Sequence, residues 1–103
     1  MNEDIFGYRR AYKRLGCFLG GIAKLADEKI CNISCHDISY KGAGIITDHP
    51  LKLNSHLKLE LSGTKIDSLI MEGKVCWCNN VRGKWRAGLL FNRVLPFTLE
   101  KII

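Results

Sequence analysis

Long apolar runs are absent from this sequence. The longest stretch that is both apolar and nearly free of charge, residues 16–23, is far shorter than the roughly 20 residues that a membrane-spanning helix needs. The chain also does not open with a basic segment followed by an apolar one, so no secretion leader is predicted. We therefore expect a soluble protein that stays in the cytoplasm.

Internal repeats, low-complexity tracts and linkers are missing too. The 103 residues, 47% hydrophobic and 25% charged, suit one globular domain with a modest core and leave no room for a second. Acidic residues are the minority, because 16 Lys and Arg oppose 10 Asp and Glu and give a formal net charge of +6. This balance favours an anionic partner such as a nucleic acid, a nucleotide or a membrane surface.

The five cysteines predict neither a disulfide framework nor a metal site. Their number is odd and no secretion leader accompanies them, which indicates free thiols in a reducing compartment. Zinc usually binds cysteine pairs that lie on a turn, but the candidate ligands here lie in strand-like sequence, where residues four apart are roughly 13 Å from each other. These candidates are Cys31, Cys35, His36, Cys76 and Cys78. We expect no metal and no cofactor.

A recognisable catalytic arrangement is missing as well. The three histidines, His36, His49 and His56, stand in no motif with a nucleophile or a pair of acids. A domain of 103 residues also offers little enclosed space for a substrate. An enzyme is therefore the least favoured class.

The sequence does contain segments in which apolar and polar residues alternate, as in strands that have one face on a core. The expected strands span residues 17–25, 29–39, 43–47, 57–61, 68–78 and 85–91, and a short helix is expected over residues 98–103. Asn and Gly within residues 79–84 predict a hairpin turn. We therefore expect an all-β fold, a six-stranded antiparallel barrel with a short C-terminal helix. The alternation assigns Trp77, Trp85 and Phe91 to the core.

Residues 37–45, with the sequence DISYKGAGI, combine an acid, a hydroxyl and two glycines at the end of a predicted strand. On an extended backbone Asp37 and Ser39 point to one face, while Gly42 and Gly44 keep bulk away from it. A carboxylate can accept two parallel N–H donors, which the N1 and N2 edge of guanine presents. The alternative is that Asp37 and Ser39 organise a turn through their own backbone.

A basic run near the N-terminus is the second candidate binding feature. Arg9, Arg10, Lys13 and Arg14 fall within six residues, with two tyrosines among or beside them. Guanidinium groups donate forked hydrogen bonds to phosphate or to the O6 and N7 atoms of guanine, and they also stack on bases. The alternative is a solvated basic tail.

Together the two features resemble the motifs of the PilZ domain family, the bacterial receptors for cyclic di-GMP. Arg10 and Arg14 match the family's Arg-x-x-x-Arg motif, and Asp37, Ser39 and Gly42 match its Asp-x-Ser-x-x-Gly motif. The later segments GKVCWC and AGLLF are similar to the family's last long strands. The resemblance extends from about residue 9 to the C-terminus, so we expect a flexible segment over residues 1–8 and a PilZ-like barrel over residues 9–103.

The resemblance implies that the ligand binds on the outer surface of the barrel. Arg10 and Arg14 would contact phosphate and the Hoogsteen edge of guanine, and Asp37 and Ser39 would contact the other guanine edge or the ribose. Gly42 would let the backbone approach the ligand closely.

Two further residues are candidates by resemblance. Arg9 would be an additional phosphate contact, because the ligand carries two negative charges. Trp77 would form a wall of the site in the manner of some relatives, although its alternation with Leu69 and Val75 favours the core.

The resulting expectation is a non-enzymatic cyclic di-GMP receptor that passes the level of the second messenger to a partner protein. The partner would belong to motility, polysaccharide synthesis or secretion machinery, and no membrane insertion is expected. Two alternatives remain: a PilZ-like adaptor that binds protein without nucleotide, and a small barrel that binds single-stranded nucleic acid. A barrel that binds single-stranded nucleic acid needs exposed aromatic residues along a basic groove.

Overall fold

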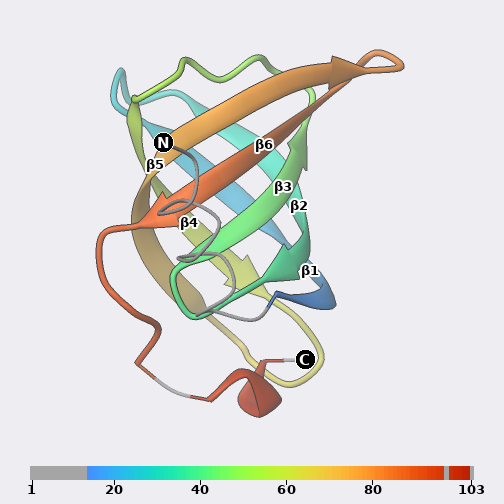
Figure 1. Ribbon diagram of the computed structural model, residues 1–103, viewed down its shortest axis with the longest axis vertical. Coiled ribbons are helices and arrows are strands. Elements are labelled where there is room, and N and C mark those ends of the chain that lie inside the picture. Colours follow the sequence, from blue (N-terminus) through green and yellow to red (C-terminus); the bar gives the residue numbers. More distant parts are fainter. Residues whose placement is uncertain (1–13, 97, 103) are drawn as a thin grey trace, which may run out of the picture.

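The computed structural model describes residues 14–96 and 98–102, and within them six antiparallel strands close into a barrel (Figure 1). The strands are β1 (Leu15–Leu25), β2 (Ile30–Ile38), β3 (Gly42–Thr47), β4 (His56–Ser62), β5 (Leu69–Val81) and β6 (Lys84–Phe91). Their order around the barrel is β1-β2-β3-β6-β5-β4. Each strand begins and ends within three residues of its predicted position, and the predicted six-stranded antiparallel barrel is confirmed.

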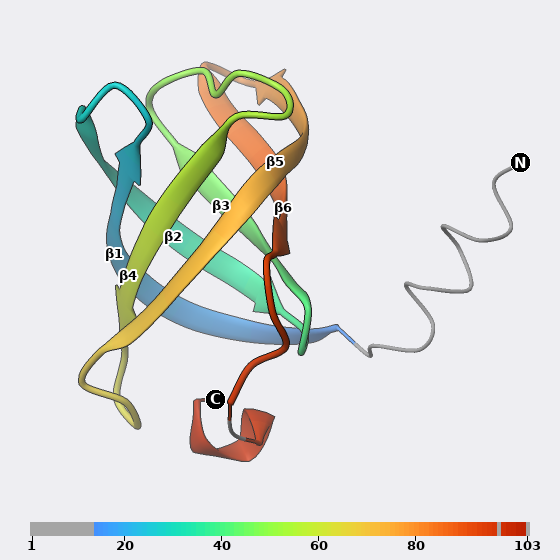
Figure 2. The ribbon, with the colours of Figure 1, turned by 90° about the vertical axis from the view of Figure 1, so that its left-hand side faces the viewer.

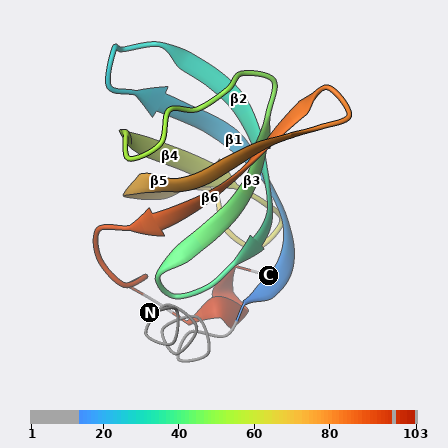
Figure 3. The same cartoon turned by 45° about the horizontal axis from the view of Figure 1, so that its top comes forward.

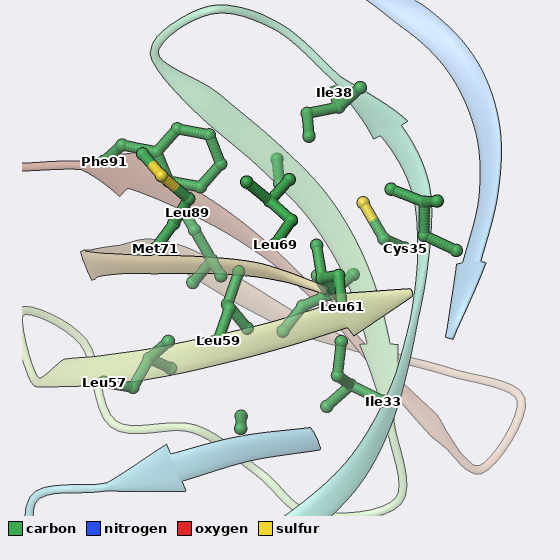
Figure 4. Close-up of a cluster of buried hydrophobic side chains, with 14 of the residues drawn as sticks. Ile33, Cys35, Ile38, Leu57, Leu59, Leu61, Leu69, Met71, Leu89 and Phe91 are labelled. Atoms are coloured by element: carbon green, nitrogen blue, oxygen red, sulfur yellow. The ribbon is translucent and has the colours of Figure 1, made fainter. Parts of the chain in front are cut away.

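The core fills the inside of the barrel with apolar side chains from all six strands (Figure 4). Strand β4 shows why the sequence folds this way, because Leu57, Leu59 and Leu61 are buried while the residues between them are exposed. The largest completely buried side chains include Phe91, which confirms its predicted place in the core. Burial of these side chains is the main contribution to folding, and it leaves the outer surface available for a site.

The C-terminal segment closes one end of the barrel, opposite the β1–β2 turn and the β3–β4 connection (Figure 2). The predicted helix is a three-residue 3-10 turn, η1 (Leu99–Lys101). Leu95, Leu99 and Ile102 are buried against the core, and the backbone N–H of Leu95 donates to the carbonyl of Tyr40 at 2.8 Å. No helix in the part of the chain that the structure describes is long and apolar enough to cross a membrane.

The β5–β6 hairpin projects beyond the rest of the barrel (Figure 3). Pairing of β6 with β3 ends at Trp85, which faces Thr47. The prediction that Trp85 belongs to the core is therefore wrong, because its ring lies where the hairpin leaves the barrel and is only half-buried. The turn takes left-handed backbone angles at Arg82 and Gly83, as the sequence pattern predicts for a tight hairpin.

Two β-bulges change the alternation of the strands that carry them. The register shifts between Cys35 and Asp37 in β2 and between Val75 and Trp77 in β5. A bulge lets two consecutive residues face the same side, so Trp77 points outward and Cys78 turns toward the core. The prediction that Trp77 belongs to the core is wrong for this reason.

Candidate functional site

One row of paired residues runs across five strands on the outer face of the barrel. Gly16 pairs with Asp37, Asp37 with Gly44, Gly44 with Gly88, and Gly88 with Trp77. Neighbouring strands are about 4.8 Å apart, so the path along the curved sheet from Asp37 to Trp77 crosses three spacings, about 14 Å. Glycines occupy the two positions between them and form a floor without side chains.

The side chains of Asp37 and Trp77 both lean over the glycine of the adjacent strand. A Cβ at Gly44 would lie 2.7 Å from Asp37 Oδ2 and 3.0 Å from Oδ1, and a Cβ at Gly88 would collide with the indole Nε1 of Trp77. The carboxylate and the indole therefore occupy the space that side chains at these two positions would fill. Glycine is needed at both positions because of this close approach, not because of an unusual backbone angle.

Arg14, just before β1, forms an ion pair with Asp37. The guanidinium Nε donates to Asp37 Oδ1 at 3.0 Å, and Nη2 donates to the same oxygen. The side chains are 40% and 29% exposed, so water screens much of their attraction. Asp37 Oδ2 receives no hydrogen bond from any described residue. The structure thus brings together two residues that the sequence singled out 23 positions apart.

These side chains surround a pocket of about 250 Å³. Of the predicted site residues, Arg14, Asp37 and Trp77 line it. Sequence reasoning did not assign Arg86 of β6 or His36 of the β2 bulge, which also line the pocket. Its remaining lining comes from Gly44, Ile45, Ile46 and Ala87. The pocket therefore combines a carboxylate, two guanidinium groups and an aromatic ring around a glycine floor.

Ser39 and Gly42 have structural contacts in the β2–β3 turn and are not part of the pocket lining. Ser39 is buried, its Oγ accepts from the backbone N–H of Lys41 at 3.3 Å, and it donates to the carbonyl of Gly42 at 3.4 Å. A Cβ at Gly42 would lie 2.5 Å from the carbonyl oxygen of Leu89. Ser39 and Asp37 therefore have different surroundings, contrary to the expected shared face. Ligand contacts of Ser39 and Gly42 remain a prediction.

Arg9 and Arg10 lie outside the described residues. Their assignment to a ligand therefore remains a prediction based on the motif alone.

The backbone below Asp37 contacts a pair of buried thiols. Cys17 and Cys35 have their Sγ atoms 3.7 Å apart, and the Cys35 thiol donates to the carbonyl of Asp37 at 3.3 Å. Burial raises the pKa of both thiols, so they stay protonated at neutral pH. No group of three or more His, Cys, Asp or Glu side chains within residues 14–96 and 98–102 is placed to hold a metal ion.

A second pocket, of about 630 Å³, lies between the β1–β2 turn and the β3–β4 connection. It is larger but less suited to a specific anionic ligand, because its lining is mainly apolar and one of its two lysines, Lys29, lies 3.8 Å from Asp27. No arginine within residues 14–96 and 98–102 lines it. The smaller pocket is therefore the better candidate for a nucleotide site.

The fold and the site define a small closed β-barrel with a candidate ligand pocket on its outer wall. The sequence model of the PilZ domain matches residues 8–103, so the chain belongs to the PilZ domain family. A search of curated protein sequences found no significant match.

Solved structures of PilZ proteins share the fold. The chain superposes on the Bacillus subtilis inhibitor of motility, MotI/DgrA, with a TM-score of 0.69 and 17% identity over 85% of this chain and 44% of that one. Escherichia coli YcgR in complex with c-di-GMP gives a TM-score of 0.72 and 20% identity over 85% of this chain and 40% of that one. The isolated PilZ domain of YcgR with c-di-GMP gives a TM-score of 0.63 and 17% identity over 90% of this chain and 82% of that one. The chain spans less than half the length of the first two proteins.

Proposed function

We propose that the chain is a receptor for cyclic di-GMP, which binds in the outer pocket between Asp37 and Trp77. The observation that carries the proposal is the Arg14–Asp37 pair above the glycine floor, because it unites both family motifs beside a pocket. Two PilZ structures with the same fold, those of YcgR, are described as complexes with c-di-GMP.

The carboxylate of Asp37 has two roles in this proposal. Its Oδ1 holds the Arg14 guanidinium in place, while Oδ2 receives no hydrogen bond from a described residue and could accept from a guanine N–H. Because Arg14 is already oriented, less side-chain entropy is lost when it donates to a phosphate or to a guanine edge. The remaining donors of Arg14 are available for that contact.

Trp77 supplies a surface on which a base stacks. Its indole lies over Gly88 and lines the pocket. Stacking of a base on an aromatic side chain contributes about 1–3 kcal/mol. Ile46 of β3, on the other side of β6 from Trp77, adds an apolar wall.

The signal would pass to a partner protein through the N-terminal arginine segment. Arg10 and Arg14 would fold over a dianionic ligand, whose charge removes the repulsion among the basic residues. Ordering the segment would cost about 1–2 kcal/mol per fixed residue and keep the affinity moderate. The ordered segment and the nucleotide together would form the surface that the partner recognises. On ligand addition, residues 6–14 should gain amide protection while β4 changes little.

Calorimetric titration with cyclic di-GMP, GTP and cyclic di-AMP tests the proposal. We expect saturable binding of cyclic di-GMP and much weaker binding of the other two. Absence of binding would leave the adaptor that recognises protein alone as the better account. Equal binding of all three nucleotides, or tight binding of single-stranded DNA, would favour a general anion or nucleic-acid surface.

A further inference from the structure

Arg86 lies on the outer face of β6, at the opposite side of the pocket from β2. It pairs with Ile46 of β3 and with Asn79 of β5. Gly88, two residues further along β6, points to the same face and carries the indole of Trp77 above it. Arg86 therefore stands next to the aromatic wall of the pocket, whereas Arg14 stands at the carboxylate.

The two guanidinium groups of the pocket differ in their partners. Arg14 is paired with Asp37. In contrast, no carboxylate of a described residue lies within 4.0 Å of the Arg86 guanidinium, the limit for an ion pair. The charges of Arg14 and Asp37 cancel locally, so among the described lining residues Arg86 provides the net positive charge. A guanidinium that already lines a pocket and has no acidic partner to give up is well placed to bind an anion.

We propose that Arg86 binds a phosphate group of the cyclic dinucleotide. This inference rests on the proposed function and adds to it a phosphate contact that neither family motif contains. A cyclic dinucleotide carries two phosphates, so one can lie toward Arg14 while the other lies toward Arg86. The base stacked on Trp77 lies beside the second contact, which gives the ligand one orientation across the glycine floor.

A guanidinium suits this role better than a lysine would, because its fork donates two parallel hydrogen bonds to a phosphate. A solvated arginine without a ligand role would contribute little to binding. A contact to the guanine edge would make Arg86 discriminate between bases, whereas a phosphate contact affects all cyclic dinucleotides alike.

Calorimetric titration of four proteins tests the inference: the unmodified chain, Arg86→Gln, Arg86→Lys and Arg93→Ala. Gln keeps most of the side-chain length but removes the charge, and Arg93 is an exposed arginine outside the pocket lining. We expect about tenfold weaker binding of cyclic di-GMP by Arg86→Gln and unchanged binding by Arg93→Ala. The deficit of Arg86→Gln should shrink as salt rises from about 50 mM to about 500 mM, because salt screens the contact. Arg86→Lys should recover part of the affinity.

The outcomes separate this inference from the proposed function. Binding of cyclic di-GMP by the unmodified chain and by Arg86→Gln with equal affinity would overturn the role of Arg86 and leave the receptor intact. A selective loss of preference for guanine over adenine would also overturn the phosphate contact. Failure of the unmodified chain to bind would overturn both. Equal melting temperatures of the four proteins would show that differences in affinity do not come from unfolding.

Discussion

The carboxylate of Asp37 lies over Gly44, its partner in the β2–β3 ladder, so closely that a Cβ at residue 44 would be 2.7 Å from Oδ2. This relationship makes the position of the carboxylate depend on a residue without a side chain. It also explains how a polar group at the end of β2 comes to lie beside a pocket that β3, β5 and β6 help to line.

Gly44→Ala should weaken binding of cyclic di-GMP by about tenfold, because the new methyl group displaces the carboxylate from Arg14. The fold should survive, since the obstructing atoms are the movable end of a side chain. Gly20→Ala is the matched control, because a Cβ there meets nothing within 4 Å. Titration and thermal melting of both variants give the comparison. Equal affinities of Gly44→Ala and Gly20→Ala for cyclic di-GMP would show that binding does not depend on the position of the carboxylate.

Asp37→Ala should reduce affinity for cyclic di-GMP by about ten- to a hundredfold, since it removes a charge-assisted acceptor and releases Arg14. Preference for cyclic di-GMP over cyclic di-AMP should fall at the same time. Asp67→Ala, an exposed acid in the β4–β5 loop, makes the same change of charge away from the pocket. Calorimetry with both ligands measures the effects. Retained selectivity in Asp37→Ala would disprove guanine recognition by this residue.

Trp77 should report binding through its fluorescence. The chain has two tryptophans, so Trp85→Phe leaves Trp77 as the only one. We expect its emission to be quenched when a base stacks on the indole, and we expect Trp77→Ala to lose about 1–3 kcal/mol of binding free energy. Emission that stays unchanged at saturating ligand would place the base elsewhere.

Most of the fold follows from the sequence, because residues such as Leu57, Leu59 and Leu61 alternate with exposed ones along each strand. Trp77 is different. Its strand has the right pattern up to Val75, and the bulge that turns the indole outward leaves no signal in apolar and polar alternation.

The site is only partly predictable for a related reason. Arg14 and Asp37 could be selected by motif and charge, but Arg86 could not, because β3 pairs with the distant strand β6 and not with β4, which follows it in sequence. That pairing places Gly44 beside Gly88 and brings Arg86 to the pocket. Strand neighbours that are distant along the chain are the information that single-sequence patterns lack.

The buried thiols predict how stability depends on pH. Burial raises the pKa of Cys35 far above its ordinary value of 9.0, and it raises that of Cys17 as well. Above pH 9 the unfolded chain therefore releases protons that the folded chain retains. The contribution of these thiols to the free energy of unfolding should be fully present at neutral pH, and the free energy of unfolding should fall as the pH rises above 9.

Urea denaturation across this range measures the effect. Cys35→Ala should be less stable at neutral pH but should lose less stability between neutral and alkaline pH than the unmodified chain. Cys76→Ala, which removes an exposed thiol, should follow the unmodified chain. If Cys35→Ala and the unmodified chain lost the same amount of stability as the pH rises, the pH dependence would not come from the Cys35 thiol.

Mapping of NMR shifts during a titration shows whether cyclic di-GMP binds on the outer wall between Asp37 and Trp77. We predict the largest changes at the backbone amides of Gly44 and Gly88 and at the indole N–H of Trp77. Amides of residues 25–31 and 49–55, around the larger pocket, should change little. Large changes around that pocket, with Gly44, Gly88 and Trp77 unaffected, would contradict the account.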